Sequence, residues 1–260
     1  MIPASPLLIA CDIDGTLVRT GHPATMAVRE AASAVLAAGH HIVLATGRSL
    51  AGALPVAREL GLDDAWIVAS NGAATAHVQG GGYEVIERHD VDAEVTVRLA
   101  MATQPGIRVA AEVVGAGYRV NLPFPEGELN GEQREVAGVE ELWAEPTPRL
   151  ALHGPGAYRL VHPLRMLRLT AIETRSDWVY VTPHGLSKAT ALEKVRTELG
   201  VEDHATVAIG DGDNDLEMLG WAMTSWAMGH APGHVQAIAT RVAGTIDDDG
   251  AAGALRSLLA

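Results

Sequence analysis

Two aspartates spaced two residues apart stand directly after a short apolar run near the start of the chain. The run covers residues 7–11, and Asp12 and Asp14 follow it, with Gly15 and Thr16 next. Uninterrupted apolar residues bounded by turn residues are typical of a strand buried on both faces, as in a parallel sheet. Ligands of such sheets bind beyond the carboxyl ends of the strands. If the chain stays extended there, both aspartate side chains leave it on the same side.

Close carboxylates repel each other unless something positive lies between them. Mg²⁺ is a hard cation that prefers oxygen ligands, so Asp12 and Asp14 predict a magnesium site at this strand end. The alternative for an isolated pair of this kind is a turn with two solvated aspartates. The rest of the chain decides between the two.

Three more short apolar runs end in small polar loops. Residues 42–45 lead into Thr46, residues 66–69 lead into Ser70-Asn71-Gly72, and residues 206–209 lead into Gly210. Helical spacing of apolar residues predicts helices between and after these runs, over 23–39, 49–60, 188–199, 216–222 and 232–239. Strands alternating with helices predict an α/β protein with a Rossmann-like, doubly wound parallel sheet.

This rhythm changes after the glycine triplet at 80–82, which predicts a hinge or a tight turn. Residues 107–114 and 118–122 read as a hairpin, and a helix is expected near 91–103. The sequence therefore predicts an inserted α+β cap domain. Its predicted bounds are 84–181, with a discontinuous core domain formed by 1–83 and 182–260.

Composition limits the partners of the protein. The 260 residues carry a formal net charge of −13, which argues against a broad nucleic-acid footprint or attraction to an anionic membrane. No apolar stretch has the length of a membrane helix, and the N-terminus lacks the pattern of a signal peptide. The lone cysteine, Cys11, allows a reducing compartment. We therefore expect a cytoplasmic protein whose oligomeric state the sequence does not indicate.

The strand-end loops, taken in order, resemble the haloacid dehalogenase (HAD) superfamily of phosphohydrolases. The sequence at 12–17 matches the first motif of that superfamily, 44–48 the second, Lys188 the third and 210–215 the fourth. A large insert between 70–72 and Lys188 is similar to the Cof-like subfamily with a type C2 cap. The motifs lie in the core, and the insert matches by position and size.

The resemblance implies a Mg²⁺-dependent phosphatase that hydrolyses small phosphorylated metabolites, sugar phosphates among them. Asp12 would be the nucleophile that forms an aspartyl-phosphate, and Asp14 the general acid and base. Asp12, the Asp14 carbonyl and Asp211 would bind Mg²⁺, with Asp215 as a direct or water-mediated ligand. Because Asp215 lies four residues after Asp211, both can face one centre on a helix.

The remaining expected site residues concern the phosphate. The resemblance implies phosphate contacts from four positions besides Lys188, namely Thr46, Gly47, Asn71 and Asn214. Lys188 is one of only two lysines in the chain, the other being Lys194. Since helix N-termini disfavour positive charge, a nearby anion explains Lys188 better than chance does.

Several side chains fit more than one role at this stage. Arg48 fits a carboxylate partner or a substrate contact, and Asn71 fits a turn or a phosphate contact. Tyr118, Arg119 and Asn121 lie on the predicted cap hairpin, where they could face the site or serve structure alone. Asp213 is expected to be solvated, and no chemistry is assigned to the acidic turn at 247–250.

Two other functions fit the same motifs. A phosphomutase would use the same aspartyl-phosphate chemistry but return the phosphoryl group to a sugar. A catalytically idle protein could use the fold to bind a phosphorylated ligand, although all motif acids are present. A dehalogenase is disfavoured, because Asp14 supplies the acid/base group that phosphoryl transfer needs.

Overall fold

The computed structural model describes residues 5–259, which form two compact units. The first, the core unit, contains residues 5–47, 53–86 and 187–259 of those described. The second, the cap unit, contains Arg48–Gly52 and Glu87–Leu186. Compared with the predicted cap at 84–181, the cap unit begins and ends a few residues later and also takes in the start of a helix at 48–52.

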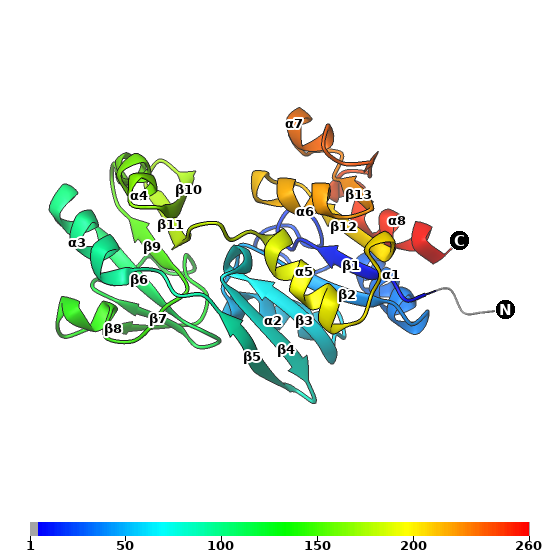
Figure 1. Cartoon of the computed structure of the whole chain (residues 1–260), viewed down its shortest axis with the longest axis horizontal. Helices are drawn as coiled ribbons and strands as arrows, with labels where there is room; N and C mark the ends of the chain where they lie inside the picture. Colours follow the sequence, from blue (N-terminus) through cyan, green and yellow to red (C-terminus); the bar gives the residue numbers. More distant parts are fainter. Residues whose placement is uncertain (1–4, 260) are drawn as a thin grey trace. The chain divides into compact units, whose positions relative to one another are not determined.

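The core unit is built on an eight-stranded sheet (Figure 1). Its first six strands in spatial order run parallel, and the pairing of the sixth with the seventh is antiparallel. In spatial order the strands are β14 (Arg241–Val242), β13 (Thr224–Ala227), β12 (Thr206–Gly210), β1 (Leu8–Cys11), β2 (His41–Ala45), β3 (Asp64–Ala69), β4 (Ala74–Gln79) and β5 (Gly82–Arg88). This confirms the predicted α/β sheet, with β1 flanked by β12 and β2.

Helices follow most of the parallel strands. They are α1 (Met26–Ala37), α2 (Leu50–Glu59), α5 (Lys188–Glu198), α6 (Leu216–Trp221), α7 (Gly233–Gln236) and α8 (Gly250–Arg256). Thr25 caps α1 by accepting a hydrogen bond from the Val28 amide, and the buried side chains of α1 recur at helical spacing. Ser187 caps α5 in the same way through the Thr190 amide, as the sequence predicted.

The tight turn predicted at the glycine triplet 80–82 is confirmed, and it joins β4 to β5 within the core sheet. One helix prediction for the core unit needs correction. The helix predicted over 232–239 shrinks to α7, and the last helix is α8, which follows the acidic turn and was not predicted. Its small residues obscured it: Gly250 begins α8 and approaches the backbone of Gly244 so closely that a Cβ would lie 2.1 Å from the Gly244 oxygen.

The cap unit is a mostly antiparallel sheet with helices (Figure 1, green strands). In spatial order its strands are β10 (Leu169–Arg175), β11 (Trp178–Pro183), β9 (Leu150–His153), β6 (Arg108–Val113), β7 (Gly117–Val120) and β8 (Glu132–Glu135), of which β7 and β8 pair in parallel. The helices are α3 (Ala93–Thr103) and α4 (Val161–Met166). The predicted hairpin is confirmed as β6 and β7, whereas β8 and β10 were missed.

Each unit has its own apolar core. In the core unit, buried side chains of β1, β2 and β12 pack against α5 and α6. In the cap unit, one face of the sheet packs against α3 and α4, and the other carries a smaller cluster with Tyr118, Phe124 and Trp178. None of the helices over residues 5–259 is long and apolar enough to cross a membrane.

Candidate active site

Asp12 stands at the carboxyl end of β1, where the sequence predicted the centre of the site. Its amide donates to the Ile209 carbonyl of β12 at 2.9 Å, so the pairing of β1 with β12 continues through this residue. The residue is only 5% exposed, and the preceding strand is fully buried. The rigid strand therefore fixes the backbone from which the Asp12 carboxylate projects.

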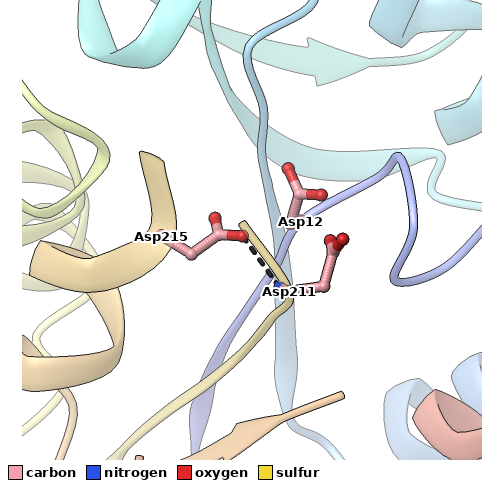
Figure 2. A group of neighbouring side chains, drawn as sticks. All are labelled: Asp12, Asp211 and Asp215. Carbon is pink, nitrogen blue, oxygen red and sulfur yellow. Dashed lines mark hydrogen bonds between the residues drawn. The ribbon is translucent and has the colours of Figure 1, made fainter. Parts of the chain in front are cut away.

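The loop after β12 brings two more carboxylates to the same place (Figure 2). Each of Asp12, Asp211 and Asp215 offers one oxygen, and these oxygens lie within 4.8 Å of one another. The Asp215 Oδ2 atom accepts from the amides of Asp211 and Gly212, both at 2.9 Å, which ties the turn to its own side chain. Three acidic groups from two neighbouring strand ends thus meet at one edge of the sheet.

Lys188 supplies the positive charge among these carboxylates. Its ammonium donates to Oδ1 of Asp12 and, at 2.6 Å, to Oδ1 of Asp215. The side chain is fully buried although it sits in the first turn of α5. The anion that the sequence predicted beside this lysine is therefore a pair of carboxylates. Lys194, by contrast, is exposed.

The electrostatics of the cluster follow from burial and proximity. Burial raises the pKa of Asp12 well above its ordinary value; Lys188 opposes this, and Asp215 adds to it. Burial likewise raises the pKa of Asp211, with Asp215 again adding to the effect. Burial alone would lower the pKa of Lys188, but Asp12 and Asp215 raise it to about 12. Lys188 is therefore charged at neutral pH, and both acids lack a full counter-charge.

Gly15 allows the first loop to lie against Asp211. Its φ of +81° is in the left-handed region, and a Cβ there would fall 2.3 Å from Oδ2 of Asp211. The next residue, Thr16, donates from its hydroxyl to Oδ1 of Asp211 at 3.0 Å. The Asp-Gly-Thr sequence thus couples the loop after β1 to the loop after β12.

The residues expected to contact phosphate lie in the loops after β2, β3 and β12. The Asn71 amide donates to the Thr46 carbonyl at 3.0 Å, and the Asn214 side chain donates to Oδ1 of Asn71, also at 3.0 Å. A Cβ on Gly47 would come within 3.4 Å of Asn71 and 3.5 Å of Asn214. The four residues predicted to contact phosphate besides Lys188 are therefore neighbours. Asn71 also has a φ of 55°, a strained value of the kind that clusters at functional sites.

The carboxylate of Asp14 is not part of the cluster formed by Asp12, Asp211 and Asp215. The chain turns after Asp12, so the condition of an extended backbone, under which both aspartates would leave on the same side, is not met. Oδ1 of Asp14 accepts from the Thr20 hydroxyl at 3.2 Å. Arg48 donates from its guanidinium to the Gly52 carbonyl at 3.2 Å. Asp213 is solvated as predicted, with His234 beside it.

All three cap residues named from sequence have structural partners within the cap. The Arg119 guanidinium donates to the carbonyl oxygen of Glu145 at 2.9 Å, and it also bonds the Glu145 carboxylate. Asn121 joins the backbone of β6 by accepting from Val109 and donating to Ile107. Tyr118 belongs to a buried polar cluster that includes Arg149.

The donor set fits a hard divalent cation. The cluster contains three carboxylates and one ammonium, so its formal charge is −2. Its members are Asp12, Asp211, Asp215 and Lys188. Oxygen donors are the ligands that Mg²⁺ prefers. Both oxygens of Asp215 already accept hydrogen bonds, from Lys188 on one side and from two backbone amides on the other. Asp12 and Asp211 are thus the better candidates for direct ligands.

His230 is a neighbour of the site that the motifs did not reveal. It lies in the loop after β13, and its Nε2 atom is 3.7 Å from Oδ2 of Asp211. The only sequence signal was its position just beyond a fifth parallel strand, where ligands of such sheets gather.

Comparison with known proteins identifies the family of the chain. The sequence model of the haloacid dehalogenase-like hydrolases matches residues 9–109 and 162–255. Phosphoglycolate phosphatase of Natronomonas pharaonis is 29% identical over 93% of this chain and 93% of its own. The phosphatase BT1666 of Bacteroides thetaiotaomicron has a structure with a TM-score of 0.80 and 28% identity, covering 97% of this chain and 95% of that one. The HAD subclass IIB sugar phosphatase BT4131 gives a TM-score of 0.80 and 25% identity, covering 97% of this chain and 98% of that one.

The chain belongs to the haloacid dehalogenase-like hydrolases, and it is a phosphoric monoester hydrolase of that family. The internal stretch that the family sequence model leaves unmatched, residues 110–161, falls inside the cap unit. The matched ranges include Asp12, Lys188, Asp211 and Asp215.

Proposed function

We propose that this chain is a Mg²⁺-dependent phosphatase of small phosphorylated metabolites, and that it works through an aspartyl-phosphate on Asp12. The observation that carries the proposal is the buried Lys188 ammonium held between Asp12 and Asp215, with Asp211 as an uncompensated third acid. A bound Mg²⁺ would supply positive charge to the phosphoryl dianion, which the acidic cluster would otherwise repel.

In the first step an oxygen of Asp12 attacks phosphorus, forming the Asp12–phosphorus bond as the ester bond to the leaving group breaks. Lys188 favours the ionised form of Asp12 despite its burial, and its ammonium stabilises charge on the phosphoryl oxygens. Asp14 gives its proton to the leaving alkoxide. Its carboxylate is partly exposed and outside the buried cluster, which suits a group that must move protons.

In the second step Asp14 takes a proton from a water molecule that attacks the phosphorus. The bond to Asp12 breaks, inorganic phosphate leaves, and Asp12 is regenerated. Thr46, Gly47, Asn71 and Asn214 are proposed to hold the phosphoryl group, a role supported by their proximity. Asp12 and Asp211 are proposed as direct Mg²⁺ ligands with the Asp14 carbonyl, while Asp215 fixes Lys188 and the loop.

For the substrate we propose a sugar phosphate or a similarly small phosphomonoester. This rests on the described activity of BT4131, a sugar phosphatase of similar fold. A cytoplasmic location is part of the same proposal, because phosphorylated metabolites are abundant there.

The test is phosphate release from p-nitrophenyl phosphate and a panel of phosphorylated metabolites, in EDTA and after Mg²⁺ is added back. We expect no turnover in EDTA and full recovery with Mg²⁺. Full activity in EDTA would refute the metal requirement. Turnover that needs a sugar bisphosphate and releases no inorganic phosphate would indicate a phosphomutase instead.

A further inference from the structure

His230 faces Asp211 from the loop after β13. The Nε2 atom of His230 lies 3.7 Å from Oδ2 of Asp211, while Thr16 donates to the other oxygen, Oδ1, at 3.0 Å. The side chains are 33% and 21% exposed, so solvent reaches the pair only in part. Asp211 is thus approached by a different side chain at each of its oxygens.

The second ring nitrogen of His230 fixes the orientation of the imidazole. The Ile246 amide donates to Nδ1 at 3.2 Å. A neutral imidazole that accepts at Nδ1 carries its proton on Nε2, the atom that lies 3.7 Å from Oδ2 of Asp211. A backbone amide therefore selects the tautomer that offers a donor to the carboxylate.

The loop that carries His230 is held on both sides of the residue. The Gln236 side chain donates to the carbonyls of Gly229 and Ala231, at 3.1 and 2.9 Å. The Gly229 amide in turn donates to Gly244 at 3.0 Å. These hydrogen bonds fix the residues on both sides of His230, and they therefore limit the positions that its imidazole can take.

A second histidine–aspartate pair nearby provides a natural contrast. His234 bonds Asp213, but these side chains are 60% and 76% exposed. Asp213 belongs to neither the carboxylate cluster nor the set of residues around Asn71 and Asn214. Exposed pairs of this kind contribute little to stability.

We infer that His230 is a positioning residue that, together with Thr16, orients the Asp211 carboxylate for Mg²⁺ binding. The inference rests on the proposed function, because Asp211 is proposed there as a metal ligand. Partners that hydrogen-bond a ligating carboxylate limit its rotation, and their loss weakens metal affinity about 10–100-fold. The 3.7 Å separation is longer than a direct hydrogen bond, so the proposed contact requires His230 Nε2 and Oδ2 of Asp211 to move closer by about half an ångström when Asp211 binds the metal.

The experiment is calorimetric titration of Mg²⁺ alone into the full chain, without substrate. We expect His230→Ala to raise the Kd for Mg²⁺ by about tenfold or more. His230→Gln, which retains an N–H donor at similar reach, should recover part of that loss. His234→Ala is the matched control and should leave the Kd within about twofold of wild type. At saturating Mg²⁺, kcat of His230→Ala should return to near wild type. The substitution removes a group that orients Asp211 and no group that reacts with the substrate.

The outcomes separate this inference from the proposed function. If wild type binds Mg²⁺ and both His230 variants bind it equally well, the inference is wrong and the metal site stands. If His234→Ala loses as much affinity as His230→Ala, the effect is a general loss of surface charge and the inference is again wrong. If wild type binds no Mg²⁺, the proposed metal assignment fails, and the inference fails with it. Thermal unfolding in EDTA identifies any misfolded variant, and His230→Gln then carries the comparison.

Discussion

The core unit and the cap unit each bury a cluster of charged side chains, and the two clusters differ in how their charges balance. In the core unit, Lys188 contacts Asp12 and Asp215, and Asp211 is the third carboxylate of the same cluster. In the cap unit, Arg149 lies 3.1 Å from the single carboxylate of Glu112, and both side chains are almost fully buried. Arg149 also bonds the Tyr118 hydroxyl and stacks 4.6 Å from the centre of the Tyr180 ring.

This difference in charge balance indicates which cluster has a function beyond stabilising the fold. Burial of a charge is costly unless it is paired, and the cap cluster meets that condition with one acid and one base. The core cluster does not, because it carries two negative charges more than positive ones. Such an excess is tolerated at functional sites, where a ligand completes the balance. The cap cluster is accordingly assigned a structural role, and the charge excess of the core cluster supports its proposed role in binding a cation and a phosphoryl group.

The largest effect is expected from Asp12→Asn. The amide has nearly the same shape but is a poor nucleophile, so activity should fall by at least about 10³-fold. Because the substitution removes a buried charge that lacks full compensation, Tm in EDTA should not fall below that of wild type. Phosphate release and thermal unfolding measure the two effects. A variant that kept more than about a tenth of the wild-type rate, a cost of only ~1.4 kcal/mol, would exclude Asp12 as nucleophile.

Lys188→Ala tests the cation within the core cluster. We expect kcat/KM to fall roughly 10²–10³-fold, the size of effect seen when one preorganised stabiliser of charge is lost. Lys188→Arg should recover only part, because a planar guanidinium does not replace a compact ammonium. Lys194→Ala, on the same helix but exposed, is the control and should retain activity. Similar losses at both lysines would indicate damage to α5.

Substitution in the cap cluster should lower the stability of the protein and leave Mg²⁺ binding unchanged. Glu112→Gln leaves Arg149 buried without its counter-charge, so the free energy of unfolding of the cap should fall by about 3–5 kcal/mol. The matched control is the exposed pair of Glu94 and Arg98 on α3, where Glu94→Gln should cost under about 1 kcal/mol. Urea unfolding measures both. A Glu112→Gln protein of unchanged stability but weaker Mg²⁺ binding would reverse the roles assigned to the two clusters.

The smallest expected effect is a dependence of stability on pH. Burial raises the pKa of Asp12 in the folded protein above its ordinary value of 3.8. The folded state therefore binds this proton more tightly than the unfolded state, so the Asp12 contribution to stability declines as pH rises from about 3.8 through the raised value. The Tm of wild type minus that of Asp12→Asn should fall with rising pH in EDTA, and Mg²⁺ should reduce the slope. A difference that rises with pH would contradict the direction given for this pKa.

Much of the core site could be predicted from sequence, because parallel strands bring their carboxyl ends to one edge. Asp12 and Asp211 follow from that rule, and Lys188 follows from its unfavourable place at a helix start. Asp215 lies beside Asp211 as expected, but through a turn and not through helical spacing, because Asp211 precedes the helical residues. The spacing could not reveal that both oxygens of Asp215 accept hydrogen bonds from Lys188 and from backbone amides.

Other features depend on packing that no local pattern encodes. The cap pair of Glu112 and Arg149 forms because β6 lies beside β9. The order of antiparallel strands in a sheet cannot be predicted from a local sequence pattern. His230 reaches Asp211 through the position of a loop anchored by Gln236. The helix α8 was missed because its small residues give a weak apolar pattern.

The most direct test of the account is to locate the phosphoryl group on the protein. Asp14→Asn should still accept a phosphoryl group from p-nitrophenyl phosphate in Mg²⁺, because that substrate has a good leaving group, but it should hydrolyse the intermediate slowly. Rapid acid quenching and mass spectrometry of the peptides should then find the phosphoryl group on Asp12, and no label in a variant that also carries Asp12→Asn. A phosphoryl group on another residue, or retained labelling without Asp12, would contradict the claim that the unbalanced core cluster is the phosphatase site.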